Sequence, residues 1–343
     1  MTTIVTPYLL RTPQPSLLVN EDMRINQREF STVALSAGGI AFPADKFLVY
    51  SDSVGITVSR DSDSPPISML GYKSVACAKI ESTSAGALGE LSTAFNIEGS
   101  DGLALVDNKI ITFSFAAKFN YAGQFSVGIR NSNNTASYVK PFSIISGGDW
   151  NMYSMTLSVD YDTAGGTWNF GRAALMGFVL GLGNTFATTS TYETWLTGNT
   201  PYAVGNTSLK GASGRIAKFC GLKAELGAQR TPLIQIPITE AQDRCQRYYQ
   251  RNPILFGAAL NATTQYFTWP FKTEMVANPT VNLLSTTPNS EHPPFSVSKV
   301  GAGSGITSHV GTGGCDMSIT GFTGLTTNSP SMLYNNNVEA VCF

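Results

Sequence analysis

Apolar and polar residues alternate without a break over Tyr153-Ser-Met155-Thr-Leu157-Ser-Val159-Asp-Tyr161. Successive side chains of a β-strand point to opposite sides of a sheet, so this segment has an apolar side and a Ser/Thr/Asp side. A sheet with one apolar side is typical of antiparallel structure in which that side is buried against another layer. The segment therefore predicts two stacked antiparallel sheets, which together form a β-sandwich.

The same two-residue period recurs elsewhere in the chain. Clusters of Gly, Asn, Asp and Pro lie between the alternating segments, as expected for turns between neighbouring strands. The further alternating segments are Ile111–Ala117, Gln124–Arg130 and Leu222–Leu226. Short apolar runs follow near the C-terminus, at Gln265–Phe271, Phe295–Val300 and Met317–Phe322. We expect an all-β chain, with a large sandwich followed by a smaller β module.

One segment, Thr239–Gln250, has helical spacing instead. Ala241, Cys245 and Tyr248 recur at intervals of three and four residues, with polar residues between them. Thr239 and Gln242 match a capping box, in which two side chains satisfy free N–H groups at the start of a helix. We therefore expect one helix here, connecting the sandwich to the C-terminal module.

Charge is scarce in this sequence. Asp, Glu, Lys and Arg make up 13% of the 343 residues, about half of their usual share. The 22 basic residues meet 23 acidic ones, which argues against nucleic acid as a partner. The 19 Phe, 13 Tyr and 4 Trp can build a core, which argues against disorder. Ser and Thr number 70, and a neutral surface of this kind suits contact with identical chains or with uncharged sugars.

We expect no membrane insertion and no secretion. The most apolar run, Ala173–Gly183, is interrupted by glycines and is too short to span a bilayer. Met1–Ser16 lacks the basic start and the long apolar stretch of a signal peptide. The five cysteines are widely spaced and include no C-x-x-C pair, so we expect them to be buried, reduced thiols.

Catalytic chemistry finds little support in the sequence. Its two histidines, His292 and His309, lie in no motif of nucleophilic catalysis. Two carboxylate pairs, Asp61/Asp63 and Asp160/Asp162, have the residue type needed for glycoside hydrolysis or, with further oxygen ligands, for calcium. Their places in a turn and at a strand end favour ordinary solvated carboxylates. We expect no catalytic residue, no metal and no cofactor.

Three aromatic rings with small polar neighbours make Tyr192-Glu-Thr-Trp195-Leu-Thr-Gly-Asn-Thr-Pro-Tyr202 a candidate glycan site. Aromatic rings offer an apolar face to the C–H faces of sugars, and Asn, Thr and backbone groups can bind the hydroxyls. The alternative is that Trp195 closes the end of the sandwich core. The sequence leaves both interpretations open.

Three segments resemble segments of bacteriophage fibre proteins, and they occur in the same order along the chain. The first, Leu17–Arg28 followed by Ala44-Asp45-Lys46-Phe47, is similar to the family opening "NLL-N-D-x-R-I-N-Q-R…A-D-R-W". The second joins Phe219–Pro232 to Ala241–Gln250 and resembles a "QLE-G" strand end, an "ATP-E" turn and an "E-L-x-R-C-Q-R-Y-Y" helix. The third, Phe271–Val281, is similar to "F-x-x-x-M-R-x-x-P-T-V". The chain departs from the family in lacking an acidic residue after the turn and in having Lys-Phe for Arg-Trp.

The resemblance implies a domain order. A jelly-roll β-sandwich like that of carbohydrate-binding modules would occupy residues 31–235, a connecting helix 236–251 and a smaller C-terminal β domain 252–343. Residues 1–30 would form an arm that anchors the chain to a particle. The anchoring residues would be Pro13, Leu17 and Leu18, and the residues that pack against the sandwich or a neighbouring subunit would be Cys245, Tyr248 and Tyr249.

The resemblance also implies a virion protein, typically a homotrimer, made in the host cytoplasm and displayed on the virion surface. Its partners would be other capsid or tail proteins and, for a receptor-binding fibre, polysaccharide of the bacterial surface. The alternative is a capsid-decorating head fibre or cement protein without a ligand. A third hypothesis, a glycan-degrading enzyme on a β scaffold, is the least favoured by the residues.

Overall fold

The fold is taken from a computed structural model of the chain, which forms two compact units. The first unit comprises Met1–Asn26 with Phe30–Ile236, and the second comprises Gln27–Glu29 with Pro237–Phe343. The structure describes residues 13–86, 90–102, 110–131, 133–144, 147–159, 168, 174–183, 188–252, 255–283, 289–292, 297–300, 305–322, 327, 330–334 and 338–342.

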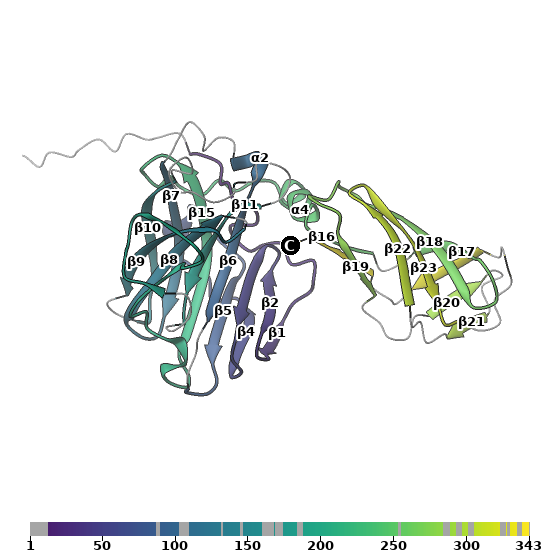
Figure 1. Ribbon diagram of the computed structural model, residues 1–343, viewed down its shortest axis with the longest axis horizontal. Helices are drawn as coiled ribbons and strands as arrows, with labels where there is room; N and C mark the ends of the chain where they lie inside the picture. Colours follow the sequence, from purple (N-terminus) through teal and green to yellow (C-terminus); the bar gives the residue numbers. More distant parts are fainter. Residues whose placement is uncertain are drawn as a thin grey trace, which may run out of the picture. The chain divides into compact units, whose positions relative to one another are not determined.

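Two antiparallel sheets form the first unit, and their strands stack as two layers (Figure 1). The six-stranded sheet has the order β1 (Thr32–Leu35), β4 (Ile56–Asp61), β5 (Cys77–Ser82), β15 (Ile216–Leu226), β7 (Ile110–Phe119), β10 (Trp150–Ser158). The seven-stranded sheet has the order β13 (Trp195–Thr197), β9 (Ala136–Ile144), β8 (Gly123–Asn131), β11 (Ala174–Gly181), β6 (Leu91–Glu98), β3 (Phe47–Ser51), β2 (Gly39–Ala44). The predicted jelly-roll β-sandwich is confirmed.

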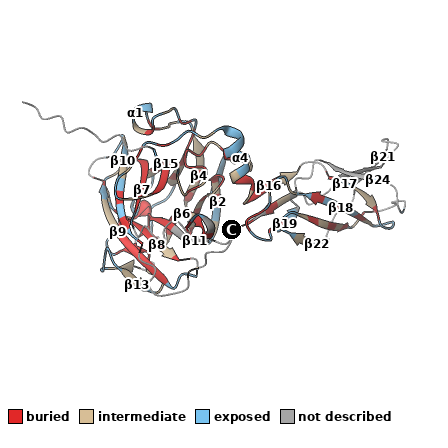
Figure 2. Ribbon diagram, turned by 90° about the horizontal axis from the view of Figure 1, so that it is seen from above, coloured by how far each residue is buried: buried red, intermediate tan, exposed pale blue. Residues whose placement is uncertain are grey.

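Aromatic rings from both sheets fill the space between the layers. Phe113 of β7 stacks on Phe178 of β11 with ring centroids 4.6 Å apart, and Phe119 of β7 lies 4.7 Å from Phe125 of β8. All four rings are buried, and β7 and β15 are buried along most of their length (Figure 2). Burial of this apolar area is the main stabilising term of the unit.

The alternation in the segment around Leu157 has the predicted result. On β10, Met155 and Leu157 are buried, whereas Ser154, Thr156 and Ser158 are exposed. The segments predicted around Phe113, Val127 and Leu226 also form strands, as β7, β8 and the end of β15. Short elements complete the unit: α1 (Ile67–Leu70), α2 (Gly99–Gly102), the 3-10 turn Leu209–Gly211, and the parallel pair β12 (Thr188–Thr189) and β14 (Tyr202–Ala203).

The N-terminal segment belongs to the sandwich earlier than expected. Leu17 N–H donates to the Ala224 carbonyl at 2.8 Å, and Leu222 N–H donates to the Glu21 carbonyl at 2.9 Å. Leu18 is buried in the core, Leu17 packs against it, and Pro13 is exposed. The side chain of Leu18 therefore contacts its own chain, and residues 17–26 are part of the folded unit instead of a free arm. An anchoring role for the residues before them stays a prediction.

Among the residues that the structure describes, the second unit contains one helix and two antiparallel sheets. The three-stranded sheet has the order β16 (Tyr249–Asn252), β25 (Val338–Val341), β19 (Thr280–Leu283). The seven-stranded sheet has the order β21 (Val297–Val300), β20 (Asn289–His292), β24 (Pro330–Tyr334), β17 (Leu255–Ala259), β18 (Thr264–Pro270), β23 (Gly314–Thr320), β22 (Gly305–Gly311). The expectation of a smaller C-terminal β module is met.

The helix, α4 (Ile238–Gln246), differs at both ends from the sequence prediction. Pro237 stands at its N-cap and no side chain caps it, so the predicted capping box with Thr239 does not form. The helix ends at Gln246 and the chain enters β16 at Tyr249. Pairing of Tyr249 with Val341 of β25 outweighs the helical spacing that Tyr248 seemed to continue.

Two further observations concern the chain as a whole. In the described ranges, no helix is both long and apolar enough to cross a membrane. Each of the five cysteines is a free thiol in a buried position. Burial raises the pKa of the Cys220 thiol to about 12, so this group is protonated at neutral pH.

Candidate functional site

The structure separates the three rings of the predicted glycan site. Tyr192 is 38% exposed. Trp195 lies on the edge strand β13, packs against the core, and donates from Nε1 to the Ser158 carbonyl at 3.1 Å. Tyr202 is 3% exposed, and its hydroxyl donates to the carboxylate of Glu90. Trp195 therefore closes the side of the sandwich, and the buried ring of Tyr202 is not available for stacking on a sugar.

Tyr202 is buried because residues 200–207 lie across the outer side of the seven-stranded sheet. A Cβ atom added to Gly128 would lie 2.1 Å from the Pro201 carbonyl oxygen, and one added to Gly181 would lie 2.6 Å from the Tyr202 ring. These two strand glycines therefore permit the close approach of the covering segment. Asn206 Nδ2 completes the contact by donating to Ser126 Oγ at 2.9 Å.

The strand end and turn of the family resemblance form a buried ionic network. Lys223 and Glu225 are fully buried, with 3.0 Å between Lys223 Nζ and Glu225 Oε2. Glu225 accepts hydrogen bonds from the N–H and the hydroxyl of Thr231, and Lys223 donates to the Pro232 carbonyl at 3.0 Å. Burial lowers the pKa of Lys223, although the pairing with Glu225 opposes that shift. The Lys-x-Glu strand end and the Thr-Pro turn are thus joined by an ion pair and hydrogen bonds that stabilise the fold.

The N-terminal part of the resemblance is also structural. Asn20 is buried in a left-handed conformation with a φ of 62°. Its side chain donates to the carbonyls of Ile25 and Asp45, at 2.9 and 2.8 Å, and accepts from the Ile25 N–H at 3.0 Å. One asparagine therefore fixes both the Asn-x-x-x-x-Ile turn and the Ala-Asp pair of the matched segment.

Within the second unit, the Cys-Gln-Arg-Tyr-Tyr motif contacts the Gln27–Glu29 segment. The Arg28 guanidinium lies 3.9 Å from the centroid of the Tyr249 ring, and Gln27 Nε2 donates to the Tyr249 carbonyl at 3.1 Å. Cys245, Tyr248 and Tyr249 are buried in their own chain. Packing of these three residues therefore occurs within one chain, and packing against a neighbouring subunit stays a prediction.

The carboxylate pair Asp61/Asp63 is engaged by lysines. Lys218 Nζ lies 2.9 Å from Asp61 Oδ2 and 2.8 Å from Asp63 Oδ2, and Lys118 Nζ lies 3.0 Å from Asp63 Oδ2. Partial burial opposes ionisation of Asp63, but hydrogen bonds from Lys218, Lys118 and Trp150 outweigh it and lower its pKa to about 2. An acid this strong cannot protonate a glycosidic oxygen at neutral pH. The second pair, Asp160/Asp162, lies outside the described residues.

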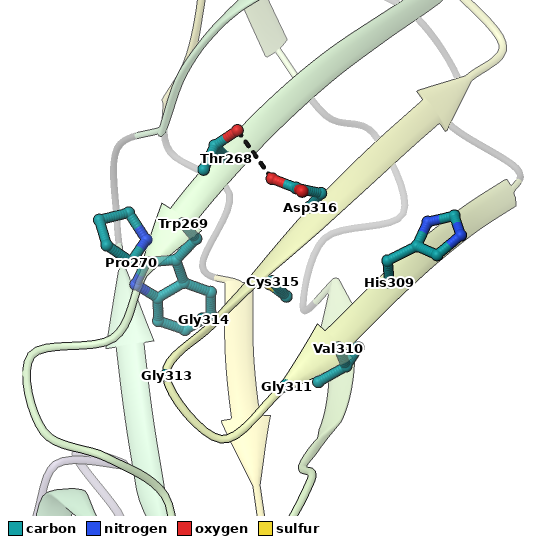
Figure 3. A pocket seen from close by; sticks show the side chains of 10 residues that line it. All are labelled: Thr268, Trp269, Pro270, His309, Val310, Gly311, Gly313, Gly314, Cys315 and Asp316. Atoms are coloured by element: carbon teal, nitrogen blue, oxygen red, sulfur yellow. Dashed lines mark hydrogen bonds between the residues drawn. The ribbon is translucent and has the colours of Figure 1, made fainter.

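The most exposed aromatic surface lies instead on the large sheet of the second unit, and we call it the ring face. It consists of Phe256, Tyr266, Thr268, His309 and Asp316. Phe256 is 70% exposed and Tyr266 is 36% exposed. On β18, Gln265, Phe267 and Trp269 point into the core, so Tyr266 and Thr268 point outward. Thr268, Asp316 and His309 are cross-strand partners on β18, β23 and β22, and they line up from strand to strand in Figure 3.

Beside this row lies an open hollow of about 520 Å³, within the size range of small-ligand sites. It is lined by Thr268, Asp316 and His309, and by Gly311 and Gly314, which face each other where β22 turns into β23. A Cβ atom added to Gly314 would lie 2.8 Å from the Trp269 carbonyl oxygen, so this glycine permits the close approach of β23 to β18. Thr268 Oγ1 donates to Asp316 Oδ1 at 2.8 Å (Figure 3).

The ring face can stack apolar ligand surface and accept hydrogen bonds. Sequence analysis considered His309 only for catalysis and did not single out Tyr266, Phe256 or Asp316. The alternation of Thr264–Pro270 contained part of the signal, since it places Tyr266 and Thr268 on one side. For metal binding, no cluster of three His, Cys, Asp or Glu side chains occurs among the residues that the structure describes.

Comparison with known families identifies no relative by sequence. No protein-family model matches the chain, and no curated protein matches it.

Comparison with solved structures finds partial similarities. The enzymatically active domain of tailspike protein 4 from bacteriophage CBA120 matches 62% of this chain, which spans 21% of the tailspike chain, with 11% identity and a TM-score of 0.33. The family 11 carbohydrate-binding module of Clostridium thermocellum matches 59% of this chain and 99% of its own, with 13% identity and a TM-score of 0.29. Likeness at this level says nothing about ligand or activity, and the fold class rests on the strand registers given above.

Proposed function

We propose that the chain is a non-enzymatic virion protein of a bacteriophage, of the fibre or receptor-binding type, that recognises glycan on the bacterial surface. The observation that carries the proposal is the contact between two of the segments that resemble phage fibre proteins. Arg28 and Gln27 of the first segment bind Tyr249 of the Cys-Gln-Arg-Tyr-Tyr motif. A chance likeness would not be expected to place matched residues that lie 222 positions apart in direct contact.

The other matched residues support the same conclusion. Glu225 needs Thr231, and Asn20 needs the backbone of Asp45, so each motif residue has a partner within the motifs. The resemblance therefore corresponds to a set of interactions that specifies one architecture. These residues indicate a lineage. Because they bond within the chain, ligand recognition would use other surfaces.

Binding without hydrolysis is favoured by the state of the carboxylates. Retaining and inverting glycosidases need one carboxylic acid that is protonated near neutral pH. Lys218 and Lys118 hold Asp63 in the ionised form, and Lys218 also pairs with Asp61. Incubation with host polysaccharide should therefore leave its chain length unchanged.

The proposal is tested by locating the chain on the particle and counting its copies. Gold-labelled antibodies against the chain should mark virions of its own phage, and sedimentation of the purified protein should give a trimer. Labelling of the tail or of fibre tips supports receptor binding. Virions without label would overturn the proposal.

The alternative, a capsid-decorating head fibre or cement protein without a ligand, is favoured by one observation. The predicted glycan residues Trp195 and Tyr202 are used inside the chain itself, to close the sandwich and to bind Glu90. Labels evenly spaced over the capsid, together with no binding to host cells, would support this alternative over the fibre.

A further inference from the structure

We infer that the ring face of the second unit is the glycan site and that it takes a neutral saccharide. This inference rests on the proposed function and adds to it a place and a ligand class. The site would stack the sugar on Phe256 and Tyr266 and bind its hydroxyls with Asp316 and its neighbours.

The two rings stand close enough to contact one ligand. Ala258 of β17 is the cross-strand partner of Tyr266, and Phe256 precedes Ala258 by two residues on the same side of the strand. Phe256 and Tyr266 are thus diagonal neighbours, a relation that separates Cα atoms by about 7–8 Å. Phe256 is the most exposed large apolar residue in the described part of the chain. A ring this exposed is stabilised when a ligand covers it, because its apolar surface is then removed from water.

Polar groups adjoin the rings on one side. Asp316 is the diagonal neighbour of Tyr266, because Tyr266 pairs with Ser318, and it is the direct partner of Thr268 and His309. A carboxylate accepts hydrogen bonds at two oxygens, so it can bind two hydroxyl groups of a sugar. Thr268 donates to one of these oxygens, the Tyr266 hydroxyl also bonds the carboxylate, and Asp316 lines the hollow. An apolar ring surface flanked by an oriented acceptor matches the two kinds of surface that a sugar offers.

The charge of these strands selects among ligands. The five strands β17, β18, β22, β23 and β24 contain a single residue with formal charge, Asp316. An anionic polysaccharide would meet this carboxylate on strands that contain no Lys or Arg. A second copy of the chain would bury the charge in an apolar contact, which is unfavourable when no counter-ion is supplied. A neutral saccharide satisfies the carboxylate with hydroxyl donors and brings no charge of its own.

The test compares two tyrosines with almost equal exposure, Tyr266 on the ring face and Tyr192 on the first unit. The probe is surface polysaccharide from the bacterium in which the phage grows, divided by anion exchange into a neutral and an acidic fraction. The full-length wild-type trimer should bind the neutral fraction, with an affinity that is unchanged between low and high salt. Phe256→Ala and Tyr266→Ala should each weaken binding about five- to tenfold, whereas Tyr192→Ala should bind like wild type.

Several outcomes would overturn the inference. They are equal binding by Phe256→Ala, Tyr266→Ala and wild type, binding of the acidic fraction alone, loss of the trimer in Phe256→Ala, and no binding to either fraction. Circular dichroism of each variant shows whether it is folded, and Asp316→Asn, which keeps the size of the side chain, provides a second test of the same site. Gold labelling of virions is independent of these measurements, so labelled virions with failed binding refute the site but not the virion protein.

Discussion

One aromatic pair from each unit shows a contrast between core and surface. In the first unit, Phe113 and Phe178 stack in the core and have no exposed surface. In the second unit, Phe256 and Tyr266 are exposed on strands β17 and β18, which contain no charged residue. The first unit therefore has the character of a scaffold, and the second has the character of a contact surface.

Polar groups show the same contrast. In the first unit, Lys223, Glu225 and Asn20 are buried and form hydrogen bonds within the chain. In the second unit, Asp316 lines a hollow at the surface and bonds the hydroxyls of Thr268 and Tyr266. Groups that are fully engaged inside a fold specify its structure, whereas an exposed acceptor beside exposed rings suits recognition. This difference is the reason for proposing the ring face of the smaller unit as the binding surface.

The largest loss of stability should come from removing one partner of the buried ion pair in the first unit. Glu225→Ala leaves the ammonium group of Lys223 buried without a counter-ion, and such changes lower the free energy of unfolding by about 3–5 kcal/mol. Replacing both partners, as Lys223→Met with Glu225→Leu, should recover most of the loss because no unpaired charge is left. Urea unfolding of the three proteins measures these differences.

An exposed pair in the same unit provides the control. Lys140 and Glu193 lie 3.2 Å apart, and the Glu193 side chain is 58% exposed. Glu193→Ala should lower stability by about 0.5 kcal/mol or less. Similar losses for Glu225→Ala and Glu193→Ala would contradict the description of Lys223 and Glu225 as a buried network.

The next largest effect on stability concerns Gln27–Glu29, the N-terminal segment that belongs to the second unit. Arg28→Ala removes the guanidinium from the Tyr249 ring, and a desolvated cation–π contact of this kind is worth about 1–2 kcal/mol. Hydrogen exchange should speed up in peptides from 238–252, with peptides from the sandwich core unchanged. Arg28→Lys keeps the charge but not the planar group, so its exchange rate in these peptides should lie between those of wild type and Arg28→Ala. Faster exchange in the sandwich alone would show that Gln27–Glu29 supports the first unit instead.

Much of the fold could be predicted from the sequence because strand alternation is a local signal. The segment around Leu157 shows its buried and exposed sides in its residue types, and β10 has the same pattern. The end of the helix could not be predicted in this way. Tyr248 and Tyr249 continue the helical spacing, but β16 begins at Tyr249 because its partner Val341 lies far away in the chain.

The candidate site depended on contacts that no local pattern contains. Tyr202 is buried because Gly128 and Gly181 admit the segment that carries it, and only the folded sheet brings these residues together. The ring face depends on the register that places Tyr266 beside Ala258 and Ser318. Alternation in Thr264–Pro270 identifies two sides of the strand, but the neighbouring strands decide which side is covered.

A smaller effect should appear in the pH dependence of the stability of the first unit. The pKa of Asp63 is lowered in the folded state to about 2 from an ordinary value of 3.8. Its contribution to stability is therefore fully present above pH 4 and is lost as the pH falls towards 2. Because the side chain is 39% exposed, solvent screening reduces this contribution to about 1 kcal/mol or less.

Asp63→Asn removes this contribution. The thermal midpoint of the variant should lie below that of wild type at pH 7, and the two should converge as the pH falls to 2. A difference that is constant from pH 7 to pH 2 would show that the loss is due to packing or hydrogen bonding and not to ionisation.

Substitutions in the ring face should have the smallest effect on stability. A small effect would show that these exposed rings, unlike the core rings of the first unit, contribute little to the fold. Phe113→Ala in the core should lower the free energy of unfolding by about 3–5 kcal/mol, because it removes a fully buried ring. Phe256→Ser and Tyr266→Ser should change it by no more than about 0.5 kcal/mol, since these rings are exposed in the folded as well as the unfolded chain. Urea unfolding at two protein concentrations distinguishes the explanations. A loss above 1 kcal/mol that grows with concentration would mean that another copy of the chain covers these rings, and the ring face would then be an assembly surface.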